Sequence, residues 1–135
     1  MNVIQQIAEA LNASYIRDDF ARINLLADKV TKYPLIAETL PTDGVINGAF
    51  APAYAATKNV IVCFLVPCHL DFTGDDVSAK IDEMIYLAQR FCAKCREVNG
   101  DFPANIRFNA VLDFLDANLC GIRCTIPKYN QPICV

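Results

Sequence analysis

Apolar and polar residues follow one another along the chain in patterns that predict two amphipathic helices. Within residues 2–12, apolar side chains recur three and four positions apart, as they do on one face of a helix. A longer helix is expected from about Asp75 to Asn99, because Thr73 and Asp76 have the spacing of a capping box and Asn99-Gly100 suits a helix end. Its apolar stripe contains Ile81, Ile85, Ala88, Cys92 and Cys95.

Other segments have the patterns of strands. The stretch NVIVCFLVP, residues 59–67, is apolar throughout, which is typical of a central strand buried on both faces. Residues 32–41 are apolar and bounded by prolines, and Pro34, which has no amide hydrogen, favours the edge of a sheet. Residues 105–115 and 119–127 alternate around a turn and predict a β-hairpin. The packed face of its first strand is expected to contain Ile106, Phe108, Ala110, Leu112 and Phe114.

Three segments are less regular. Residues 14–32 fit a helix, through the spacing of Phe20, Ile23, Ala27 and Val30, but ARINLLA within them also fits a strand. Residues 42–58 contain two turn signals and predict a long loop, a kind of segment that is often functional or ordered by a partner. Residues 128–135 predict a loose tail.

Together these elements predict a single α+β domain over residues 1–135, which is enough chain to bury a core of its own. The expected order is α-β-β-α-β-β. An antiparallel or mixed sheet with the helices packed mainly on one face would bury the apolar patterns.

Composition narrows the functional classes. The chain has 12 basic and 15 acidic residues, a net charge of −3 and no basic run, so direct nucleic-acid binding is not expected. The N-terminus lacks the basic and apolar regions of a signal peptide, and the longest apolar run, residues 60–68, is too short to cross a bilayer. We therefore expect a cytoplasmic chain whose seven cysteines are free thiols.

The motif FCAKC, with Cys92 and Cys95, raises the question of a metal or redox site. Both cysteines lie on the apolar stripe near the C-terminal end of the predicted helix, where the helix dipole disfavours a thiolate. Structural zinc sites usually take such a pair from a tight turn, with a second pair of ligands elsewhere. We therefore predict thiols packed in the core, no cofactor and no bound metal.

The remaining candidates for chemistry are weak. His69 follows Cys68, but adjacent residues in an extended chain point apart, and a third group to orient the imidazole is not evident. The run DFTGDD, residues 71–76, has its glycine in the wrong place for a calcium loop and fits a helix cap better. The sequence therefore predicts a protein that is not an enzyme.

The run HLDFTGDDVSAKIDEMIYLAQRFCAKCREVNGDF, followed by IRFNAVLDFLDANLCGIRCTI, resembles small proteins of Bacteroidetes phages and prophages. Their pattern is an F-L-…-D-F-…-G-E/D lead-in, a helix with M-x-x-L-A-x-x-F, then a strand and D-x-x-D-A/V-N-x-x-G-I/V. The matching residues are Phe64, Leu65, Asp71, Phe72, Gly74, Met84, Leu87, Ala88, Phe91, Asp113, Asp116, Ala117, Asn118, Gly121 and Ile122. The match covers roughly residues 59–126 and favours extended structure around residues 20–27.

The resemblance implies a structural virion protein, similar to the tail-terminator, tail-completion or head–tail neck subunits of long-tailed phages. Such subunits assemble as rings, often hexameric, and contact other tail and neck proteins. The expected location is therefore the virion, after synthesis in the host cytoplasm.

In such a ring, residues 42–58 and the tail would serve as docking arms. The candidate interface residues are Asp43, Gly44, Asn47, Gly48, Phe50, Tyr54, Asp116, Asn118 and Tyr129. One alternative is a small protein-binding module encoded on a mobile element. A less favoured alternative is a metal or redox protein that uses Cys92, Cys95 and His69.

Overall fold

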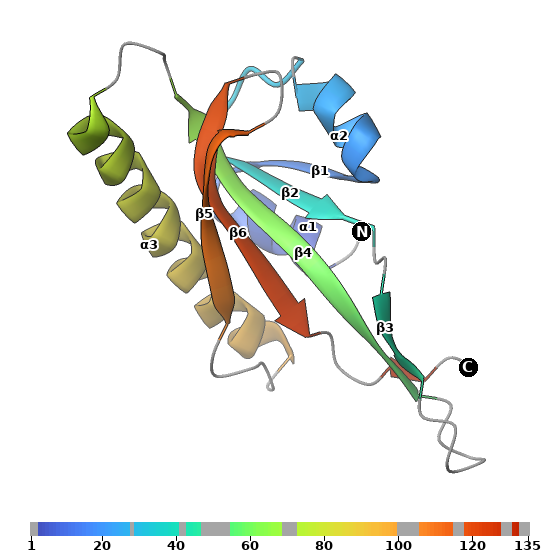
Figure 1. Cartoon of the computed structure of the whole chain (residues 1–135). Helices are drawn as coiled ribbons and strands as arrows, with labels where there is room; N and C mark the ends of the chain where they lie inside the picture. The colour runs from blue at the N-terminus through green and yellow to red at the C-terminus, as the bar shows by residue number, and fades with distance from the viewer. Residues whose placement is uncertain are drawn as a thin grey trace.

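The fold is a mixed β-sheet with helices on both faces (Figure 1), as seen in a computed structural model. The structure describes residues 3–27, 29–40, 43–46, 55–68, 73–99, 106–114, 118–127 and 131–132. The main sheet has the strand order β1-β2-β4-β6-β5, and β3 and β7 pair with β4 off this path. The predicted α+β class is confirmed.

The described sheet contains one parallel strand pair. Their bounds are β1 Ser14–Asp18, β2 Leu35–Thr39, β3 Asp43–Ile46, β4 Ala55–Pro67, β5 Arg107–Phe114, β6 Leu119–Pro127 and β7 Gln131–Pro132. β1 and β2 are parallel, and every other strand pair is antiparallel. The predicted hairpin is formed by β5 and β6, and the predicted central strand is β4, which lies between β2 and β6.

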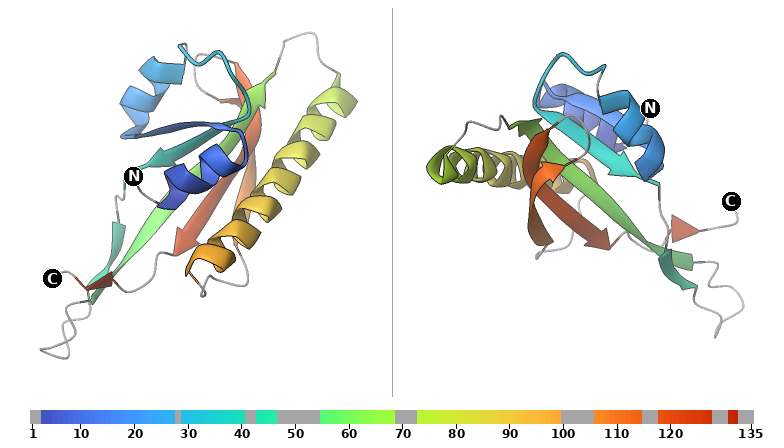
Figure 2. Two further views of the ribbon diagram at one scale, coloured as in Figure 1. Left: turned by 180° about the vertical axis from the view of Figure 1, so that it is seen from behind. Right: turned by 45° about the horizontal axis from the view of Figure 1, so that its top comes forward.

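Three helices complete the fold: α1 Val3–Ala10, α2 Phe20–Ala27 and α3 Gly74–Asn99. α1 and α3 lie side by side on one face of the sheet (Figure 2, left). α3 begins with the predicted capping box. The amide of Thr73 donates to Asp76 Oδ2 at 3.0 Å, and the amide of Asp76 donates to Thr73 Oγ1 at 3.2 Å.

Strand alternation divides the interior into two apolar cores. Successive side chains of a strand point to opposite faces, so Val62 and Phe64 pack with α1 and α3, whereas Cys63 and Leu65 pack on the face of α2. The ring of Phe64 meets the ring of Phe91 on α3 edge to face, with 5.3 Å between the centroids. The expectation of helices mainly on one face therefore holds for α1 and α3, while α2 packs on the opposite face, over β1 and β2.

Two predictions from the N-terminal half are wrong. Residues 20–27 form the helix α2 rather than extended structure, and only residues 14–18 of the ambiguous segment form a strand. The observed order of elements is therefore α-β-α-β-β-β-α-β-β-β. β2 is an internal strand between β1 and β4, because Pro34 lies just before it and its missing amide hydrogen disrupts no ladder.

The segments predicted as a loop and a tail contain paired strands. Residues 43–46 form β3, and residues 55–58 begin β4, so the described parts of the predicted loop over residues 42–58 are paired antiparallel strands. Within the predicted loose tail, residues 131–132 form β7 and pair with the start of β4. The remaining residues of both segments lie outside the described residues.

Candidate interaction surfaces

A three-stranded extension of the sheet is the main surface feature. β4 is 13 residues long, and its first residues pair with β3 on one side and with β7 on the other. We call the described residues 43–46, 55–59 and 131–132 the β-arm. In Figure 1 the β-arm projects away from the helices, towards the lower right. Among the residues of β4 whose burial is described, 59–67, Val60 is the first buried one, and it lies where the strand enters the main sheet.

The predicted interface residues fall in different places. Asp43 and Gly44 lie on the β-arm, opposite Asn59 and Lys58, and the Asn59 side-chain amide donates to Asp43 Oδ2 at 3.4 Å. The other predicted interface residues of this region and of the C-terminal segments lie outside the described residues: Asn47, Gly48, Phe50, Tyr54, Asp116 and Tyr129. Of the candidates in this region, the structure therefore describes Asp43 and Gly44, which are adjacent in the sequence and lie on the β-arm.

Asn118 lies at the opposite end of β4 from the β-arm. It has a positive φ of 55°, a conformation that asparagine tolerates better than most residues, and its carbonyl accepts a hydrogen bond of 2.8 Å from the Cys68 amide. These contacts are those of a turn that leads into β6. The structure thus gives Asn118 a role in turn geometry.

The β5 edge of the sheet carries an exposed aromatic side chain. β5 pairs with β6 and is the last strand in the sheet order. Phe108 was expected on the packed face but is 45% exposed, and the neighbouring Ala110 on the same face is exposed as well. The reason is that α3 lies mainly over β6 and β4, so the helix leaves the outermost strand uncovered.

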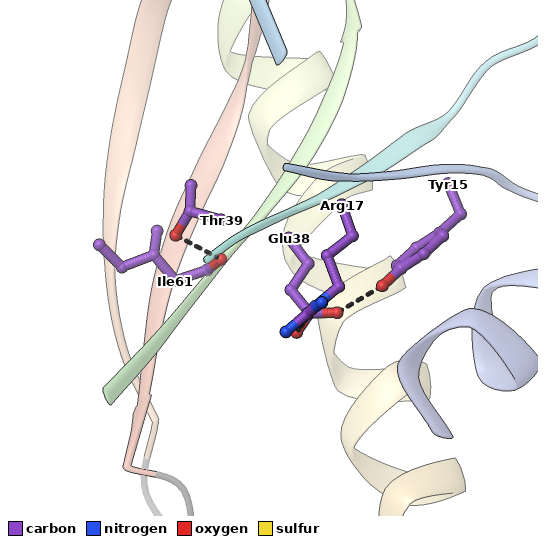
Figure 3. Close-up of polar contacts among 5 residues, drawn as sticks. All are labelled: Tyr15, Arg17, Glu38, Thr39 and Ile61. Carbon is purple, nitrogen blue, oxygen red and sulfur yellow. Dashed lines mark hydrogen bonds and ion pairs between the residues drawn. The ribbon is translucent and has the colours of Figure 1, made fainter. Parts of the chain in front are cut away.

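A buried carboxylate on β2 was not anticipated from the sequence. Glu38 is 2% exposed and is held between two side chains of β1 (Figure 3). The Tyr15 hydroxyl donates to Glu38 Oε1 at 2.5 Å, and Arg17 Nε donates to Glu38 Oε2 at 3.2 Å. The parallel register places Arg17 directly opposite Glu38. This cluster fixes the pairing of the edge strand β1, since each oxygen of the carboxylate has a partner.

The described cysteines are free thiols that pack mainly in the core. Five of them are buried: Cys63, Cys68, Cys95, Cys120 and Cys124. Cys92 is half-buried and packs against the core on the side of α3. The interpretation of Cys92 and Cys95 as packed thiols is therefore confirmed. Among the residues that the structure describes, no cluster of three or more histidine, cysteine or acidic side chains has the arrangement of a metal site.

Burial also suppresses thiolate formation. Burial raises the pKa of Cys63 and of Cys95 to about 12. The positive charge of Arg123 lowers the pKa of Cys63, and that of Arg96 lowers the pKa of Cys95, but both effects are smaller than that of burial. Burial raises the pKa of Cys124 to about 12 as well, and it raises the pKa of Cys92. At neutral pH these thiols are protonated, and a protonated thiol is a poor nucleophile.

Comparison with known proteins does not assign the chain to a family. No protein-family model matches the chain, and no curated protein is significantly similar to it. Among the described helices, none combines the length and the apolar character that a membrane crossing requires. The function must therefore be argued from the surfaces themselves.

Proposed function

We propose that the chain is a structural virion protein of a tailed phage, a tail-terminator, tail-completion or head–tail neck subunit that assembles into a ring. The observation that carries the proposal is the β-arm, in which β4 continues past the main sheet and is flanked by β3 and β7. The motif resemblance over residues 59–126 supplies the phage context.

The β-arm suits a subunit that is completed by its neighbours. The start of β4, paired with β3 and β7, lies beyond the part of the strand that contributes buried residues to the apolar cores. In a ring built from heterologous contacts, such an extension lies across the next subunit and widens the contact area. The open β5 edge offers a second place where another chain can pair with the sheet.

Native mass spectrometry of the purified full-length chain over a range of concentrations tests the proposal. A ring subunit is expected to give one predominant oligomer with a fixed number of copies, which persists on dilution into the low micromolar range. A chain that stays monomeric at every concentration would contradict the proposal.

One observation favours a second candidate, a small protein-binding module. The exposed Phe108 on the open β5 edge would suit an extended peptide that adds a strand to the sheet, because backbone pairing gives affinity and an exposed aromatic side chain gives contact area. This module would remain a monomer and bind its partner in a one-to-one complex. The same mass spectra therefore separate the two functions.

A further inference from the structure

The two faces of the sheet are covered to different extents. On one face, α1 and α3 pack over the central strands. On the other face, the eight-residue helix α2 packs mainly on β1 and β2, at the far side from β5. Much of the β5–β6 surface on this second face therefore lies outside the cover of α2.

This uncovered part, which we call the open face, carries two arginines. Ile122 and Cys124 of β6 are buried against α3, so Arg123 and Thr125 point to the opposite side. The register of β5 places Arg107 opposite Thr125 and Asn109 opposite Arg123, on that same side. All four side chains are exposed, and they form a polar surface with two positive charges.

The two arginines have no acidic partner among the described residues. Neither Arg107 nor Arg123 forms an ion pair there. Two exposed or partly exposed acids on other strands have partners of their own: Asp18 pairs with Arg22 at 2.8 Å, and Asp43 accepts from Asn59. The positive charge of the open face is therefore available to another molecule.

The opposite side of the subunit carries the complementary charge. The N-terminal half of α3 exposes Asp75 and Asp82, which lie seven residues apart and hence on the same side of the helix. Neither of these aspartates forms an ion pair with a described residue, whereas the adjacent Glu83 pairs with Lys80 at 3.6 Å. Tyr86, one turn further along, is 62% exposed and adds apolar area to this acidic surface.

The two charged surfaces also match in spacing. Residues seven apart on a helix are separated by about 10 Å along its axis. Diagonal neighbours on adjacent strands, such as Arg107 and Arg123, are about 7–8 Å apart. The long, flexible arginine side chains readily span a difference of this size, so two ion pairs can form at once.

We propose that the acidic N-terminal half of α3 in one copy docks on the open face of the next copy, with Asp75 and Asp82 facing Arg107 and Arg123. The contact joins two different surfaces, which lie on opposite sides of the sheet, so every copy both offers a helix and receives one. This inference rests on the proposed ring assembly and identifies the two surfaces that would form each contact in the ring. Repetition of such a heterologous contact generates a ring when the rotation between copies closes.

Charge reversal tests this contact. The first variant combines Arg107→Glu with Arg123→Glu, and the second combines Asp75→Lys with Asp82→Lys. Each variant alone places like charges across the contact, and we expect each to dissociate at least about 100-fold more readily than the wild type. Equal mixing should make the two variants associate with each other, because the acidic sheet face of the first variant meets the basic helix of the second, and both remaining surfaces are native. A ring with an even number of copies then closes with the variants alternating.

The matched control is Lys94→Glu with Arg96→Glu, which changes the net charge as much as the first variant does but lies on the C-terminal half of α3. It should assemble like the wild type. Circular dichroism melting checks that each variant folds. If the first variant does not fold, the milder pair Arg107→Gln with Arg123→Gln should still weaken assembly about tenfold, and the aspartate variant gives an independent result.

The outcomes separate this inference from the proposed function. If the wild type forms a ring and both reversal variants form it equally well, the docking surfaces are wrong and the ring proposal stands. Failure of the two folded variants to associate with each other on mixing would likewise overturn the inference. A wild type that never assembles contradicts the proposed function itself.

Discussion

The backbone of Gly121 on β6 lies against the carbonyl group of Phe64 on β4. A β-carbon at position 121 would lie 1.9 Å from the Phe64 oxygen, a separation that real β-carbons essentially never show, and φ at Gly121 is +154°, which residues with side chains rarely adopt. β5 has a register irregularity directly beside this position, between Val111 and Phe114. Gly121 thus lets β4, β6 and β5 pack where the sheet is distorted.

Gly121→Ala is therefore expected to destabilise the fold by about 3–5 kcal/mol, through steric overlap with backbone and an unfavourable φ. Urea unfolding followed by circular dichroism measures the change. The matched control is Gly74→Ala at the start of α3, where a β-carbon would meet nothing within 4 Å, and it should change the free energy of unfolding little. Equal effects at the two glycines would refute this account of Gly121.

The Glu38 cluster should contribute to the stability of the β1–β2 pair. Tyr15→Phe removes the hydroxyl that donates to a buried carboxylate and should cost about 1–2 kcal/mol in the free energy of unfolding. Tyr86→Phe is the matched control, because Tyr86 is 62% exposed and loss of its hydroxyl should change stability by less than about 0.5 kcal/mol. Thermal melts of the two variants side by side give the comparison, and an unchanged Tyr15→Phe protein would rule out a stabilising role.

The buried thiols predict how stability depends on alkaline pH. The pKa of Cys63 and of Cys95 is about 12 in the folded chain, whereas an exposed thiol has a value near 9.0. The unfolded chain therefore loses these protons first, so the stabilising effect is fully present below pH 9 and is lost as the pH rises towards 12. Each such thiol should lower the free energy of unfolding by about 1.4 kcal/mol per pH unit in this range.

Urea unfolding at pH 7, 9 and 10.5 checks this dependence. The double variant Cys63→Ala with Cys95→Ala should show a shallower fall above pH 9 than the wild type does. At pH 7 it should be less stable by about 1–2 kcal/mol per site, because each substitution leaves a small cavity in the core. An identical slope in both proteins would show that these thiols do not control the alkaline dependence.

The β-arm should matter for assembly rather than for folding of the subunit. Replacing residues 43–57 with a short glycine–serine linker removes β3 and the start of β4 but keeps every core residue from Val60 onward. We expect a folded chain whose oligomer is lost or strongly weakened, measured by circular dichroism and native mass spectrometry. A shortened chain that still forms the wild-type oligomer would show that the β-arm is not needed for assembly.

The helices and strands that were predicted correctly are those whose surroundings follow from a local pattern of residues. The uninterrupted apolar run of β4 requires burial on both faces, and the stripe and capping box of α3 define a helix without reference to the rest of the chain. The alternation of β6 was equally informative, since Cys120, Ile122, Cys124 and Ile126 are all buried.

The features that were missed depend on contacts between distant segments. α2 has eight residues, of which Ile23 is the one described as fully buried, so its periodicity could not be distinguished from that of a strand. The internal position of β2 and the pairing of Tyr15 and Arg17 with Glu38 depend on the parallel register with β1. The one local signal was a glutamate inside the apolar strand LIAET, which needs a partner if it is buried.

Native mass spectrometry of the intact chain, recorded from low to high micromolar concentration, tests the central claim most directly. We predict a single closed oligomer whose copy number does not change with concentration and whose mass is that of the protein chains alone. A monomer at all concentrations, or a chain that binds one partner in a one-to-one complex without self-association, would contradict the ring.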